Sequence, residues 1–137
     1  MDEAVRQYYR RLLDTGFRHA GAMENPSITL DYDNTTGHLC GKIGDELHIS
    51  ISIRDGRIND LKYICICEAI VNVVVEAMCS IAKGMYLIEA KNIDIEAFST
   101  AVGSRDVEFL KKAKIAVGLL SQGIPQYESE HLTGARE

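Results

Sequence analysis

Hydrophobic and polar positions alternate most regularly between residues 47 and 53. Every second residue there is Leu or Ile and the residues between them are polar, which is typical of a strand with one buried and one wet face. Asp55-Gly56 follows, a dipeptide that favours a tight turn, so a return strand is expected over residues 57–67. The outer face of this second strand becomes apolar at Ile64 and Ile66, which predicts that its end is covered on both sides.

The segment after this hairpin predicts a helix over residues 68–83. It is apolar almost all round, and Val73-Val74-Val75 is a poor helix former, so the helix requires burial in a central position on the sheet. Gly84 marks its end. The same periodicity and turn signals place the remaining elements in this order: helix 2–16, extended connector 17–25, strand 28–32, turn 33–37, short helix or loop 89–101, and helix 106–122 ended by Gly123-Ile124-Pro125.

This order of elements predicts an α+β fold, with an antiparallel sheet of about three strands packed on one face by helices. A chain of 137 residues has the usual size of a single domain and can bury one core. We therefore expect one domain over residues 1–125, followed by a polar tail over residues 126–137.

The charge balance narrows the classes of function. With 15 Lys and Arg against 20 Asp and Glu, the net charge is −5, so neither nucleic acid nor an anionic membrane is an expected partner. No apolar run approaches the roughly 18 residues of a membrane span, and the N-terminus is acidic, so we expect a cytoplasmic protein with reduced thiols. The sequence lacks a P-loop, a dinucleotide-binding motif and a Ser/His/Asp order, so no enzyme activity is expected.

Four cysteines are the main candidates for chemistry. Cys65 and Cys67 lie two apart and share one face of a strand, while Cys79 lies inside the central helix. Cys65 and Cys79 are most simply core residues. Cys67, at the end of the strand, and Cys40, in a loop, are the thiols available to a metal ion.

The polar residues near these thiols can also be explained without a metal ion. Glu68 at a helix start is favoured by the helix dipole, and Asp45 can satisfy backbone donors of its loop. His38, two residues before Cys40, is the one histidine that we keep as an outside ligand candidate. The other notable groups are expected on solvated faces: His48 on its strand, and Lys111, Lys112 and Lys114 on the last helix.

Five features follow one another at characteristic spacing: Tyr9, Asn25-Pro26, Gly44-Asp45 before the alternating strand, Lys62-Tyr63, and Lys83-Gly84 at the end of the central helix. Their order resembles the NifU/IscU-type N-terminal domain, the family of iron-sulfur cluster assembly scaffolds. The resemblance extends from about Tyr8 to Leu120. It implies the fold of that family and a role in cluster assembly.

Members of this family hold a nascent cluster, or zinc, with three cysteines and an aspartate. Thiolates are soft ligands that suit iron and zinc, and helix N-termini lower the pKa of a thiol. Carried over residue by residue, the aspartate is Asp45, but the first cysteine position holds Ile43, the second holds Glu68 and the third lies near Phe109. The family's Leu-Pro-Pro stretch for chaperone recognition is also missing, since Ser99 to Phe109 contains no proline.

Two interpretations of this altered ligand set stay open. In the first, the site is displaced, and Cys40, Asp45, Cys67 and Glu68 form a mixed thiolate and carboxylate site for zinc, iron or an iron-sulfur cluster. In the second, the domain carries no cluster and acts as an interaction module. It would then dock to partners such as a cysteine desulfurase or a cluster-transfer protein, or associate with itself. A third interpretation, an enzyme with Cys67 as nucleophile, has no histidine that the sequence places beside it.

Overall fold

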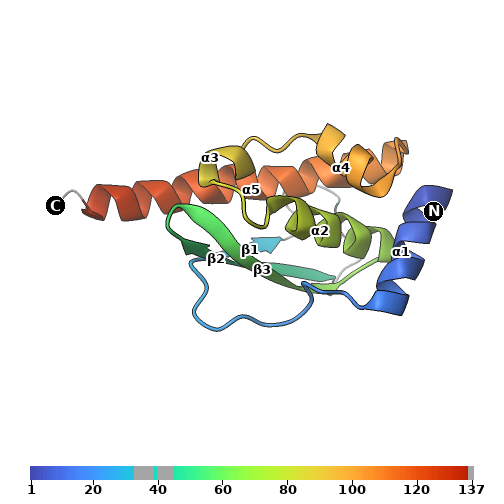
Figure 1. Cartoon of the computed structure of the whole chain (residues 1–137), viewed down its shortest axis with the longest axis horizontal. Coiled ribbons are helices and arrows are strands. Elements are labelled where there is room, and N and C mark those ends of the chain that lie inside the picture. Colours follow the sequence, from blue (N-terminus) through green and yellow to red (C-terminus); the bar gives the residue numbers. More distant parts are fainter. Residues whose placement is uncertain (33–38, 40–44, 136–137) are drawn as a thin grey trace.

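The structure, a computed structural model that describes residues 1–32, 39 and 45–135, contains a three-stranded antiparallel sheet (Figure 1). β1 spans Ile28–Tyr32, β2 spans Glu46–Arg54 and β3 spans Arg57–Ile66, and the strand order in the sheet is β1-β2-β3. The central strand β2 places Ile49 opposite Leu30 of β1 and Tyr63 of β3. The α+β fold expected from the order of elements is confirmed. The turn expected over residues 33–37 lies outside the described residues.

Helices cover one face of this sheet. Figure 1 shows α2 to α5 on one side of the strands and α1 at one end of them. The bounds are α1 Glu3–Thr15, α2 Ala69–Ala82, α3 Leu87–Ala90, α4 Ile95–Val102 and α5 Val107–Ala135. The stretch 89–101, expected as a short helix or a loop, thus contributes to two short helices. Within the described ranges, no helix combines the length and the apolar character needed to cross a bilayer.

The two faces of the sheet differ as the alternation predicts, except at the end of β3. The inward side chains of β2 are inaccessible to solvent: Leu47, Ile49 and Ile51. On the outer face, however, Ile64 and Ile66 are 44% and 58% exposed. The expectation that this strand end is covered on both sides is therefore wrong, because the helices pack on the inner face of the sheet.

The connector between α1 and β1 runs beside β3. Ala20 forms a parallel bridge with Tyr63, whose backbone N–H donates to the carbonyl of His19 at 2.8 Å. The N–H of Gly21 donates in turn to the carbonyl of Tyr63 at 2.9 Å. Residues 17–25 form no regular element, as expected, but they are extended only in part, because the N–H of Ala20 donates to the carbonyl of Phe17 at 3.0 Å in a turn. The hydrogen bonds to Tyr63 hold this segment beside β3.

Burial accounts for the existence of α2. Val73, Val74 and Val75 are fully buried in the core. Each valine lowers the intrinsic helix propensity by at most about 0.7 kcal/mol. Burying such a side chain contributes roughly 1.5–3 kcal/mol, so packing exceeds the unfavourable propensity. The helix forms because α5, α4, α1 and β3 pack around it.

The last helix is longer than the sequence suggests. Instead of ending near Gly123, α5 continues through Pro125 to Ala135, so residues 126–135, expected as a polar tail, are helical. A proline inside a helix costs about 3 kcal/mol. Two contacts of residues near Pro125 in α5 offset this cost: the side chain of Ile124 is fully buried, and Glu128 forms a 2.8 Å ion pair with Lys91. Gly123 allows close packing on β1, since a Cβ there would collide with Leu30.

Candidate functional site

The candidate site lies where β3 passes into α2, at Cys67 and Glu68, which we call the junction. Glu68 is the N-cap residue of α2 in an extended conformation, with φ −69° and ψ 155°. Its carbonyl accepts the backbone N–H of Val71 at 3.0 Å and the side-chain amide of Asn72 at 3.2 Å. Its carboxylate makes no capping hydrogen bond, so this group is directed to other partners.

Within the described ranges, Lys112 of α5 supplies a cation that pairs with that carboxylate. Its Nζ lies 3.7 Å from Oε1 of Glu68 and 3.7 Å from Oε1 of Glu108, and it donates a hydrogen bond to the carbonyl of Leu39 at 2.8 Å. The Lys112 side chain is only 7% exposed. Lysine is almost never so deeply buried unless it is paired. The carbonyl and the two carboxylates provide that pairing.

The expectation that Lys112 lies on a solvated helix face is wrong. Its neighbours Lys111 and Lys114 are exposed as expected, but Lys112 follows the buried Phe109 by three residues and so shares its face. The inward stripe of α5 continues through Ala113, Ala116 and Leu120, all fully buried. Helical spacing in the sequence already contained this signal, although the run of three lysines obscured it.

Lys112 connects its own helix α5 to two other segments, and each of its three partners lies next to a candidate ligand or to a position where the family resemblance places one. Leu39 directly precedes Cys40, Glu68 directly follows Cys67, and Glu108 directly precedes Phe109. The contacts of Lys112 bring these segments together at the junction. Phe109 is fully buried and offers no ligand atom. Glu68 and Phe109, which stand where the resemblance places two of the cysteines, thus lie in segments that these contacts connect, and neither side chain is a thiol.

The thiols near the junction are not equivalent. Cys65 is free and half-buried, and burial, with the negative charge of Asp45, raises the pKa of its thiol to about 11. Cys79 is free and fully buried in α2, and burial raises the pKa of its thiol as well. Cys79 is a core residue, as expected, whereas Cys65 is partly buried and packs against the core. Cys67 is disulfide-bonded, and Cys40 lies outside the described residues.

The proposed ligand set is only partly within the described ranges. Asp45 is half-buried just before β2, and its negative charge helps to raise the pKa of the Cys65 thiol. In residues 1–32, 39 and 45–135, no group of three or more His, Cys, Asp and Glu side chains is arranged to hold a metal ion. A sulfur in a disulfide is also not a thiolate ligand until it is reduced. The set of Cys40, Asp45, Cys67 and Glu68 stays a prediction.

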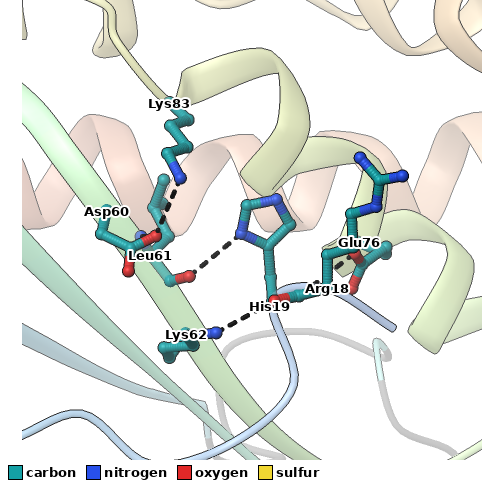
Figure 2. Close-up of polar contacts among 7 residues, drawn as sticks. All are labelled: Arg18, His19, Asp60, Leu61, Lys62, Glu76 and Lys83. Carbon is teal, nitrogen blue, oxygen red and sulfur yellow. Dashed lines mark hydrogen bonds and ion pairs between the residues drawn. The ribbon is translucent and has the colours of Figure 1, made fainter. Parts of the chain in front are cut away.

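A second polar group, which the sequence does not predict, is buried two turns further along α2. The Glu76 carboxylate accepts a hydrogen bond from the Tyr63 hydroxyl at 2.7 Å and from the backbone N–H of His19 at 3.3 Å. Figure 2 shows Glu76 and His19 side by side, with Nδ1 of His19 at 3.1 Å from the carbonyl of Leu61. Burial chiefly, and the hydrogen bond to Glu76, raise the pKa of the Tyr63 hydroxyl. This cluster ties the connector to β3 and α2 and has a structural role.

The exposed face of the sheet carries a third polar group. His48 lies on this face, as the alternation predicts, with Nδ1 at 2.6 Å from Asp31 and Nε2 at 3.4 Å from Glu46. The hydrogen bond to Asp31 is the main cause that raises the pKa of His48. His38, the other histidine kept as an outside ligand candidate, lies outside the described residues.

Comparisons with known proteins place this geometry in a family. The fold is similar to the N-terminal domain of a nitrogen-fixing NifU-like protein from Brucella abortus, with a TM-score of 0.64 and 14% identity, covering 93% of this chain and 94% of that one. It is equally similar to a candidate iron-sulfur cluster assembly scaffold protein for the SUF system from Fervidobacterium islandicum AW-1, with a TM-score of 0.64 and 16% identity over 90% and 96% of the chains.

At these identities the two structures establish the fold alone. No curated protein matches the sequence. The family model of the NifU-like N-terminal domain, however, matches residues 8–133, nearly the whole chain. This chain therefore belongs to the family of NifU-like N-terminal domains.

Proposed function

We propose that this chain acts in iron-sulfur cluster assembly as a scaffold-like protein whose cluster site is degenerate. Membership of the NifU-like family supports the role, as does the fold shared with a protein described as a candidate assembly scaffold. The observation that carries the proposal is the convergence of three segments on Lys112 at the junction. Glu68 and the buried Phe109 stand there, at positions where the family resemblance leads us to expect thiolates.

The chemistry of the remaining side chains limits what this site can hold. A phenyl ring has no donor atom for iron, so a site with three thiolates cannot be completed at Phe109. Cys40, Asp45, Cys67 and Glu68 are the residues that would hold a single zinc or iron ion once Cys67 is reduced. Zinc accepts such a mixture of sulfur and oxygen ligands. The protein would act in the cytoplasm without turning over a substrate.

Metal analysis and anaerobic cluster reconstitution of the reduced protein test this assignment. We expect less than one metal ion per chain and no stable iron-sulfur cluster in the wild type, with the bound metal lost in Cys67→Ala and Cys40→Ala. Cys65→Ala is the matched control, because Cys65 is a free thiol outside the proposed set. A stable stoichiometric cluster in the wild type would contradict a degenerate site, and a complete absence of metal would exclude the displaced one.

A second candidate function is that of an interaction module without metal. The exposed Ile64 and Ile66, which end β3 just before the junction, favour it, because apolar surface beside a site is typical of docking regions. The partners would be a cysteine desulfurase or a cluster-transfer protein, or a second copy of the chain. Affinity capture with the wild type and with Ile66→Ser tests this role. Failure to retain any desulfurase or transfer protein, together with a monomeric state in solution, would contradict it.

A further inference from the structure

The position of Lys112 at the junction has a consequence for metal binding. Its ammonium group is surrounded by the carbonyl oxygen of Leu39 and the carboxylates of Glu68 and Glu108. Oxygen atoms of these kinds also coordinate metal cations. The lysine therefore contacts the groups that an incoming cation would use.

Burial fixes the Lys112 ammonium group in contact with these oxygen atoms. With the side chain 7% exposed and the 2.8 Å hydrogen bond to Leu39 inside the protein, the ammonium cannot turn away into water without breaking a buried hydrogen bond. A divalent ion that uses Glu68 would come within a few ångströms of this fixed positive charge. Repulsion between charges at such a distance is strong wherever the surroundings are drier than bulk water.

We infer that Lys112 is a built-in cation that competes with metal for Glu68 and so lowers the affinity of the junction for metal ions. The ammonium joins the loop at Leu39, the start of α2 and the first turns of α5, so that these segments hold together without a bound ion. The inference goes beyond the proposed function, because it concerns the charge at the junction whether or not the chain takes part in cluster assembly.

Zinc titration of the full-length reduced protein, in competition with a chromophoric chelator, tests this inference. Lys112→Met removes the charge and keeps most of the aliphatic stem, while Lys112→Gln removes the charge and keeps a donor for the carbonyl of Leu39. Both variants should bind zinc at least about tenfold more tightly than the wild type, since the repulsion is gone. Lys111→Met is the matched control, and as an exposed residue it should change the affinity by less than about twofold.

A further variant assigns the gain to Glu68. In Lys112→Gln combined with Glu68→Gln, the tighter zinc binding should be lost. Circular dichroism and gel filtration confirm that each variant is folded, and Lys112→Gln decides the matter if Lys112→Met does not fold. Equal zinc affinity in the wild type and Lys112→Gln would overturn the inference, and so would an equal gain in Lys111→Met or a gain that survives the loss of Glu68.

This experiment and the tests of the proposed function fail separately. If the protein neither captures a desulfurase nor takes part in reconstitution, the zinc affinities of the lysine variants still report the effect of Lys112. If those affinities are all equal, Lys112 is only a structural cross-link, and a role in cluster assembly is unaffected.

Discussion

The hydrogen bond between Tyr63 and Glu76 offers the sharpest test of the packing around α2. Tyr63→Phe removes the hydroxyl that donates to Glu76 at 2.7 Å and leaves the shape of the core almost unchanged. Both residues are 2% exposed, so water does not replace the lost donor. A hydrogen bond to a charged group contributes roughly 1.5–3 kcal/mol to stability. Since the N–H of His19 still donates to the other carboxylate oxygen, we expect a loss of about 2 kcal/mol.

Thermal or urea unfolding followed by circular dichroism measures this loss. For a domain of this size, 1 kcal/mol corresponds to about 3 °C, so the midpoint should fall by about 6 °C. Tyr9→Phe is the matched control, because its ring keeps the edge contact with Phe17 at 5.8 Å, and its effect should stay within about 0.5 kcal/mol.

A double-mutant cycle with Glu76→Met, which has no oxygen to accept from the hydroxyl, separates this hydrogen bond from other effects of the substitutions. The coupling energy between Tyr63 and Glu76 should exceed about 1 kcal/mol, as is usual for buried residues in contact. A loss in Tyr63→Phe no larger than in Tyr9→Phe, or a coupling energy near zero, would refute the view that Glu76 fastens the connector through Tyr63.

Three further measurements test other parts of the molecule. Gly123→Ala should destabilise the protein by about 1–3 kcal/mol, because the added Cβ would collide with Leu30 of β1. Gly118 lies in the same helix with open space around it, so Gly118→Ala should stabilise the protein by up to about 1 kcal/mol. Equal effects of the two substitutions would refute the close packing at Gly123. NMR titration should give a pKa of His48 above the usual value of about 6.5, and Asp31→Asn should lower that pKa again. The stabilisation by protonated His48 should therefore be complete below about pH 6.5 and be lost as the pH rises through the higher folded-state pKa. An unchanged titration in Asp31→Asn would count against that hydrogen bond. Iodoacetamide should modify Cys65 more slowly in the native protein at neutral pH than in the unfolded chain, because burial raises the pKa of its thiol to about 11. Mass spectrometry follows the modification, and equal rates in the two states would contradict this prediction.

Elements governed by local periodicity could be predicted from the sequence. The hairpin follows from strict alternation and a turn dipeptide, and the apolar run with three valines correctly predicts a buried central helix. The length of α5 could not be predicted, because local rules weigh Gly123 and Pro125 against a helix. Tertiary contacts on β1 and with Lys91 override them.

Polar residues within apolar surroundings were harder to place. Glu76 interrupts a buried helix, and only the fold brings Tyr63 and His19 to its carboxylate. Lys112 stands among exposed lysines, and its partners come from segments 73 and 44 residues away in the chain. Convergence of this kind depends on topology. The candidate ligand residues could be named from the sequence. The position of the Lys112 ammonium between their segments could not be predicted, because it depends on the fold.

The connector beside β3 also bears on association between copies of this protein. An edge strand presents unpaired N–H and C=O groups that can pair with a strand of another molecule, especially where apolar side chains are exposed. At Tyr63 both backbone groups of β3 are already engaged by His19 and Gly21, one residue before the exposed Ile64. A variant that released the connector would open this edge and favour aggregation through β-strand pairing. The connector thus occupies the backbone groups of the β3 edge at Tyr63, where a strand of another molecule would otherwise pair.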